Sequence, residues 1–212
     1  MSVDNFELIK PLLTFNSEDE FYFVQILQRK KDNPNGYKGS NNSSRLIKAY
    51  FIDNIEYLDK HKDEMIHFAD YFNARVGINL NKRSYYKTAF NTLKTTAEMM
   101  HNKNFRDVKK AWNTSCGVHN SIEDRIWLLD IDEPEVSPMM QAFIEYECEP
   151  KMEVIFDKAG MPIEEKNRKI IAQIPSKSGH HLITKSFDTR EFIKQFPEIE
   201  IHKNNPTNLY IP

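Results

Sequence analysis

The sequence contains little cysteine, no long apolar run and no large excess of charge of either sign. Cys116 and Cys148 are the only cysteines among 212 residues. They lack Cys-x-x-Cys spacing, which fits reduced thiols and argues against a cysteine zinc site. The absence of a long apolar run argues against a membrane span. The N-terminus also lacks the basic-then-apolar pattern of a signal peptide. We therefore expect a soluble, cytoplasmic protein.

The composition suits one large domain or two small ones, since 40% of the residues are hydrophobic and 12% are aromatic. The formal net charge of −2 gives no global indication of a nucleic-acid partner. The local distribution is more informative, because Asp32 is the only acid against six bases in residues 25–52. Within this segment, Arg29, Lys30 and Lys31 are candidates for contacts with template phosphates. An ordinary solvated surface would explain the same charges.

Apolar periodicity and turn residues predict an alternation of strands and helices in the first half of the chain. Strands are expected over 20–29, 45–52 and 74–80, and helices over 57–72, 84–102 and 105–112. The first two strands would form a hairpin with a long polar loop. Ser84 has the position and side chain of an N-cap.

The second half predicts a further sheet with helices. Strands are expected over 125–132, 169–174 and 181–186, helices over 137–148 and 189–196, and a final β-pair of 199–202 with 207–211. We expect a single mixed α/β domain with a mixed or antiparallel sheet flanked by helices. Its parts would be an N-terminal α/β part, residues 1–118, and a second part, residues 119–212, that carries the chemistry.

The most informative feature is the apolar run 125–132, which ends in Asp130 and Asp132. Residues two apart on a β-strand point to the same face, so the two carboxylates would project together from the end of the strand. Hard cations prefer oxygen ligands, and two-metal sites share carboxylates. The pattern predicts a site for Mg²⁺ or Mn²⁺. The alternative is a strand that ends in two solvated acids.

A second polar motif joins two of the expected strands. Its turn consists of Ser176, Lys177, Ser178 and Gly179. Hydroxyls and amides donate to phosphate oxygens, glycine lets the backbone approach closely, and lysine adds a positive charge. Of the two histidines that follow, only one can face the site, and we expect it to be His181 because apolar residues follow it. The alternative is a polar surface hairpin.

Together these motifs resemble the catalytic core of the archaeo-eukaryotic primases and primase-polymerases. In that superfamily a hydrophobic-Asp-x-Asp/Glu strand holds divalent metals, a Ser-x-His motif binds the triphosphate of the incoming nucleotide, and a third strand supplies another acid. The order of the motifs matches from the Asp-x-Asp strand to the C-terminus. The resemblance implies that Asp130 and Asp132 are metal ligands. It also implies that Ser178 and His181, with Lys177, contact phosphate.

The third acid is where the chain departs from the pattern of the superfamily, because the expected hydrophobic-Asp pair is not visible. Glu200, which lies between two isoleucines, is the nearest candidate for a third catalytic and metal-binding carboxylate. Asp188 is a weaker candidate because its position is typical of a helix cap.

The resemblance implies a DNA primase or polymerase that adds nucleotides on a single-stranded template by a two-metal mechanism. Its partners would be nucleoside triphosphates, single-stranded DNA and a helicase or other replication proteins, in a minimal protein of a virus or mobile element. Two alternatives stay open. One is a catalytically idle nucleic-acid-binding accessory module of replication, and the other is a metal-dependent nuclease or phosphoesterase.

Overall fold

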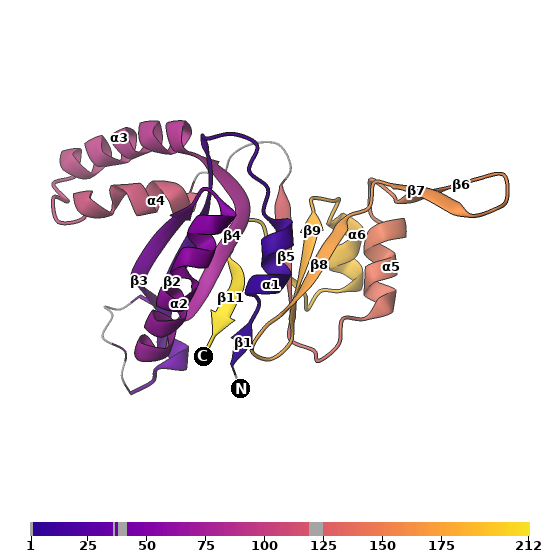
Figure 1. Cartoon of the computed structure of the whole chain (residues 1–212), viewed down its shortest axis with the longest axis horizontal. Helices are drawn as coiled ribbons and strands as arrows, with labels where there is room; N and C mark the ends of the chain where they lie inside the picture. The colour runs from indigo at the N-terminus through magenta and orange to yellow at the C-terminus, as the bar shows by residue number, and fades with distance from the viewer. Residues whose placement is uncertain (1, 36, 38–41, 119–124) are drawn as a thin grey trace. The chain divides into compact units, whose positions relative to one another are not determined.

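The computed structural model describes residues 2–35, 37, 42–118 and 125–212. By its internal contacts the chain divides into two compact units. The first unit comprises residues 1–123 and 206–212, and the second comprises residues 124–205. Each unit carries an antiparallel sheet with helices of its own (Figure 1). This confirms the predicted mixed α/β class with antiparallel sheets flanked by helices.

The first unit is built on a sheet whose described strands follow the order β1-β11-β4-β2-β3. These strands are β1 (Val3–Asp4), β2 (Glu20–Arg29), β3 (Ser44–Ile52), β4 (Arg75–Ser84) and β11 (Thr207–Ile211). The helical segments described in this unit are α1 (Phe6–Ile9), η1 (Lys10–Leu12), η2 (Lys30–Asp32), α2 (Ile55–Phe72), α3 (Tyr85–His101), η3 (Val108–Lys110) and α4 (Ala111–Val118). Strands β2 and β3 form the predicted hairpin, whose connecting loop lies partly outside the described residues.

Helices pack on both faces of this sheet because strand β2 alternates its apolar side chains. Phe21 and Phe23 lie on one face, where they form a buried cluster with Cys116 of α4. Val24 points to the other face together with Tyr50, its direct partner on β3. The ring of Tyr50 contacts His61 of α2, with ring centroids 5.6 Å apart, so α2 packs on that face.

The helix caps confirm one prediction and correct another. The Ser84 hydroxyl accepts a hydrogen bond from the backbone amide of Lys87, which begins α3 as predicted. The helix expected over 105–112 is wrong in its position, because the segment before Ala111 forms turns and the short 3-10 helix η3. The Lys110 amide bonds the carbonyl of Asp107 in this turn, and α4 begins only at Ala111.

The second unit has a sheet whose described strands follow the order β10-β5-β9-β8, with all neighbours antiparallel. Its elements are β5 (Ile126–Ile131), α5 (Pro138–Tyr146), β6 (Glu153–Phe156), β7 (Pro162–Lys166), β8 (Ile170–Pro175), β9 (His180–Lys185), α6 (Arg190–Gln195) and β10 (Glu200–His202). Without the β6–β7 hairpin, the chain order is strand, helix, strand, strand, helix, strand. This is the split β-α-β arrangement of ferredoxin-like folds.

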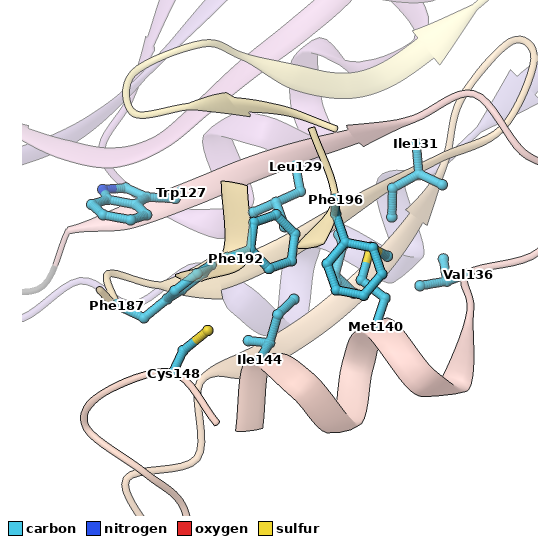
Figure 2. Packing of buried hydrophobic residues seen from close by; sticks show 11 residues of the cluster. Trp127, Leu129, Ile131, Val136, Met140, Ile144, Cys148, Phe187, Phe192 and Phe196 are labelled. Atoms are coloured by element: carbon cyan, nitrogen blue, oxygen red, sulfur yellow. The ribbon is translucent and has the colours of Figure 1, made fainter. Parts of the chain in front are cut away.

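The core of the second unit lies between one face of its sheet and the helices α5 and α6. Leu129 and Ile131 of β5 and Leu182 of β9 belong to this buried cluster. Figure 2 shows Met140 and Ile144 of α5 on the opposite side of the same cluster. As predicted, α5 begins with a Ser-Pro cap, in which the Ser137 hydroxyl accepts from the Met140 amide.

Two features of the C-terminal half differ from the expectation. The segments 199–202 and 207–211 do not pair with each other, because β10 pairs with β5 in the second unit whereas β11 pairs with β4 in the first. Residues 206–212 therefore belong to the first unit and not to a part comprising 119–212. The β6–β7 hairpin was not expected, and it extends away from α5 in Figure 1.

Candidate functional site

Three side chains with candidate chemistry lie in one row across the sheet of the second unit. Asp130 on β5 is directly opposite Glu200 on β10 and directly opposite His181 on β9. Side chains of directly opposite residues project from the same face of a sheet. Nε2 of His181 lies 3.6 Å from Oδ1 of Asp130. The row thus places two acidic residues and a histidine at paired backbone positions on three neighbouring strands.

The apolar pattern of β5 determines which face carries this row. Trp127, Leu129 and Ile131 are buried in the cluster that α5 and α6 cover. Because side chains alternate along a strand, Asp130 points to the opposite face. His181 takes that same face because Leu182, its neighbour on β9, belongs to the core. Leu128, which shares the face of Asp130, is also buried, so this face of β5 is polar only toward the end of the strand.

The three side chains of the row differ in exposure. The His181 side chain is only 11% exposed, whereas that of Asp130 is 38% exposed and that of Glu200 is 75% exposed. His181 is the deeply placed histidine, as we expected from the apolar residues after it. Packing holds its ring in one orientation, whereas the exposed Glu200 side chain can change rotamer at little cost.

The Ser176–Gly179 turn and the adjacent His180 form hydrogen bonds with the segment that follows β5. The Ser178 hydroxyl donates to Oδ1 of Asp132 at 3.2 Å. Nε2 of His180 lies 2.8 Å from the carbonyl oxygen of Pro134 and must donate, since a carbonyl only accepts. The two predicted motifs therefore meet in space, although 46 residues separate Asp132 from Ser178.

Gly179 makes this approach possible because it has no side chain. A Cβ at this position would lie 2.0 Å from the carbonyl oxygen of Ile131 and 2.9 Å from that of Glu133. Such distances are far below van der Waals contact, so any other residue would push the turn away from β5. Inside the turn, the Gly179 amide donates to the Ser176 hydroxyl at 3.1 Å, and the Ser176 amide donates to the Gly179 carbonyl at 2.8 Å. Lys177 is exposed at its tip.

Asp130 and Asp132 have different neighbours. Asp130 lies within β5 beside His181, whereas Asp132 follows the last residue of the strand and accepts from Ser178. Among the described residues, no three histidine, cysteine or acidic side chains are gathered as a group that could hold a metal ion. Metal binding by Asp130 and Asp132 thus stays a prediction. The carboxylate oxygens of this end of β5 are nevertheless the donors that a hard divalent cation prefers.

The candidates for a third acid are placed very differently. Glu200 is the direct cross-strand partner of Asp130. Asp188 precedes α6, where it accepts from the backbone amide of Arg190 and forms an ion pair with the guanidinium. The hydrogen bonds from Arg190 lower the pKa of Asp188 to about 2. Topology therefore favours Glu200 over Asp188 as a companion of Asp130.

His202 is a neighbour of the row that the sequence interpretation did not include. It lies two residues after Glu200 on β10 and so shares its face. Its Nε2 is 3.3 Å from Oε2 of Glu200. The alternation Glu200-Ile201-His202 is the signal that could have identified it.

The proposed template contacts lie in the first unit. Arg29 is the last residue of β2, and the exposed Lys30 and Lys31 begin η2. The neighbouring acid, Asp32, accepts two hydrogen bonds from the guanidinium of Arg75, at 2.8 and 2.9 Å. Its carboxylate is thus oriented by an arginine, and its negative charge is balanced there.

Two further expectations concern the chain as a whole. Cys116 and Cys148 are both free and buried, and burial raises the pKa of the Cys116 thiol to about 12 and that of Cys148 to about 11. Within the described part of the chain, no helix combines the length and the apolar character that crossing a membrane requires.

Comparisons of the chain with protein-family models, with curated proteins and with solved structures gave no significant match.

Proposed function

We propose that the second unit catalyses nucleotidyl transfer on a single-stranded DNA template, as primase-polymerases do. The observation that carries this proposal is the union of two motifs on adjacent strands. The Asp-x-Asp strand β5 pairs directly with β9, which begins with the histidine pair. The serine turn before β9 is bonded to Asp132. An acid pair, a serine and a histidine that lie close together in this order would suit the binding of a triphosphate with its metal ions.

Asp130, Asp132 and Glu200 are the residues that would hold Mg²⁺ or Mn²⁺. Three carboxylates supply oxygen ligands of the kind these ions prefer, and two of them are cross-strand partners. Bound there, the ions would supply an activated 3′-hydroxyl and charge neutralisation of the departing pyrophosphate.

The phosphate-binding role falls to Ser176, Lys177, Ser178, Gly179 and His181. The exposed Lys177 would add positive charge beside the triphosphate, and the buried His181 ring would donate from a fixed position. Ser178 donates its single hydroxyl proton to Asp132 in the structure, so it would turn to the phosphate only when that carboxylate binds a metal ion instead. Nucleotide binding and metal binding would therefore depend on each other.

Arg29, Lys30 and Lys31 would contact the phosphates of the template. Such contacts are independent of base sequence and weaken as the salt concentration rises. We propose nucleoside triphosphates, single-stranded DNA and other replication proteins as the partners of this activity.

A catalytically idle nucleic-acid-binding module is the second candidate function. It is favoured by one observation, namely that no three acidic, histidine or cysteine side chains are gathered as a metal ligand set in the part of the chain that the structure describes. An idle module would bind single-stranded DNA without incorporating nucleotides.

The test is incorporation of labelled nucleotides on a single-stranded DNA template, with and without a primer, in Mg²⁺ or Mn²⁺. We expect incorporation by the wild-type protein and its loss in the variant Asp130→Asn/Asp132→Asn. Glu153→Gln is the matched control, because it removes an exposed acid of the same unit on β6. Folded protein that binds DNA but incorporates nothing would favour the idle module. Cleavage of the template without added nucleotide would identify a nuclease.

A further inference from the structure

Helix α3 packs Tyr85 inward against Phe21, but most of its other apolar side chains lie on the outward face, unlike those of an ordinary surface helix. The side chains that pack inward against the first unit are largely polar, and several are threonines. These are Thr88, Thr92 and Thr95, of which Thr88 is buried and the other two are half-buried. A helix of a soluble domain normally turns its apolar stripe inward and its polar residues outward. The apolar stripe of α3 is therefore exposed and does not pack into the core of the first unit.

The outward apolar side chains form a continuous stripe along α3. Its members are Tyr86, Phe90, Leu93, Ala97 and Met100, which we call the α3 stripe. Leu93 is 68% exposed, Tyr86 is 66% exposed and Phe90 is 56% exposed. The rings of Tyr86 and Phe90 contact each other, with centroids 4.7 Å apart. Contiguous apolar surface of this kind marks interaction sites on soluble proteins.

The spacing of the α3 stripe fits a partner helix. Successive members are separated alternately by four and three residues, which is the spacing that keeps apolar side chains facing a second helix. The opposite side of α3 is already occupied, because it packs against α4 within the first unit (Figure 1). One further helix laid along the stripe would therefore bury it.

The charges beside the α3 stripe indicate the chemistry of this partner. Lys87, Lys94 and His101 follow one edge of the stripe, each directly after one of its members. Lys87 and Lys94 are exposed, and Nζ of Lys94 lies 4.0 Å from Oε1 of the exposed Glu98, a solvent-screened pair that leaves Lys94 available to a partner. The other edge carries Ala89 and Thr96 and no acid. These edge positions are those that form ion pairs across a helix–helix interface, so the matching edge of the partner should be acidic.

A second copy of this chain does not meet that requirement. In antiparallel packing of two α3 helices, the lysine edges would face each other and place Lys94 near Lys94 of the second copy. In parallel packing, Lys94 would face Ala89, without an ion pair. Like charges across such an interface oppose association.

We propose that the α3 stripe is a docking site for an amphipathic helix of another protein that presents acidic residues beside its apolar stripe. The proposal is independent of the chemistry of the second unit, because every residue that carries it lies in the first. Its contacts would be apolar along the stripe, and the lysine edge would select the partner by charge.

Two synthetic peptides test this proposal with the full-length protein. Both have about three heptads with leucine at the a and d positions. One carries glutamate at every e and g position, and the other carries lysine there. Each peptide carries like charges along both edges, so self-association is opposed in both. By fluorescence anisotropy of the labelled peptides, we expect the glutamate peptide to bind at least about ten-fold more tightly than the lysine peptide, and the difference to shrink as salt is added.

The variants Leu93→Glu and Lys94→Glu locate the site. Leu93→Glu should weaken binding of the glutamate peptide by about ten-fold or more, whereas Leu8→Glu, at an exposed leucine of α1, should leave it unchanged. Lys94→Glu should weaken the glutamate peptide and strengthen the lysine peptide. Equal binding of the two peptides, no binding of either, or equal effects of Leu93→Glu and Leu8→Glu would overturn the proposal. Two other results would also overturn the proposal. One is a dimer in sedimentation that Leu93→Glu abolishes. The other is binding to anionic lipid vesicles, abolished by Leu93→Glu, without binding of the glutamate peptide.

Discussion

Glu200 lies directly opposite Asp130 in the antiparallel pairing of β10 with β5. Their side chains therefore leave the same face of the sheet, next to His181 on the far side of Asp130. A cross-strand carboxylate pair gains nothing by itself, because two like charges directly opposite each other destabilise a sheet. A divalent cation bound between the two carboxylates would offset this repulsion, as the proposed function requires.

Replacing Gly179 with alanine should lower the stability of the protein. The added Cβ would meet the carbonyl oxygens of Ile131 and Glu133 at distances that neither backbone can tolerate. Overpacking of this kind costs about 1–3 kcal/mol, so we expect Gly179→Ala to lower the free energy of unfolding by that amount in urea titrations.

Gly117→Ala is the control for this prediction. Gly117 lies in α4, and a Cβ there would meet no atom within 4 Å. Alanine is favoured over glycine in a helix, so stability should stay the same or rise by up to about 1 kcal/mol. If Gly179→Ala proved as stable as Gly117→Ala, the close approach of the turn to β5 would be wrong.

Replacing His181 with alanine should weaken binding of a nucleoside triphosphate. Loss of a fixed donor to a phosphate oxygen corresponds to about 1.5–3 kcal/mol, which is about ten-fold or more in affinity. Isothermal calorimetry in Mg²⁺ measures the effect, and circular dichroism checks that the variant folds. His67→Ala removes an exposed histidine of α2 and should not change the affinity. Equal affinities in the two variants would exclude His181 from the nucleotide site.

A second structural prediction concerns the buried pair of Glu145 on α5 and Lys169, which directly precedes β8. Lys169 is 1% exposed and Glu145 is 7% exposed. Nζ of Lys169 lies 3.6 Å from Oε2 of Glu145 and donates to the carbonyls of Glu145 and Pro150. The Glu145 carboxylate accepts from the amides of Lys169 and Ile170. The pair thus joins α5 to the edge strand of the second sheet.

Removing the negative charge with Glu145→Gln should cost about 3 kcal/mol at neutral pH, because a buried lysine is left unpaired. Burial lowers the pKa of Lys169 below its usual value, and Glu145 partly offsets this effect. In the variant the pKa of Lys169 in the folded state falls further. The unfolded state therefore binds more protons than the folded state over a wider pH range. The stability of the variant should therefore rise with pH toward the pKa of an unfolded lysine.

Urea unfolding at about pH 7 and about pH 9.5 measures this dependence. The stability difference between wild type and Glu145→Gln should shrink at the higher pH. Glu165→Gln, which removes one partner of the exposed Arg168–Glu165 pair, should cost less than about 1 kcal/mol at both pH values. A difference that stays constant with pH would show that Lys169 does not titrate between them.

The parts of the fold that sequence periodicity determines were predicted well. Strand β2 begins and ends where its aromatic and β-branched run does, and the caps at Ser84 and Ser137 mark the starts of α3 and α5. These are local properties, which a short window of sequence contains.

The pairing of the last strands could not be predicted in the same way. Segments 199–202 and 207–211 are neighbours in sequence, and such neighbours often pair. Here each segment completes the sheet of a different unit, because β10 covers the open edge of β5 and β11 lies beside β4. The position of Glu200 opposite Asp130, and the close fit of Gly179 against β5, depend on this long-range arrangement and not on local pattern.

The most direct test of the site is Mn²⁺ binding measured by calorimetry on the folded proteins. We predict that the wild type binds Mn²⁺, that Asp130→Asn loses this binding, and that Glu200→Gln weakens it by about ten-fold, the effect of losing one charged ligand. Glu153→Gln should bind as the wild type does. If all four proteins bind Mn²⁺ alike, or if none binds it, Asp130 and Glu200 do not form a metal site.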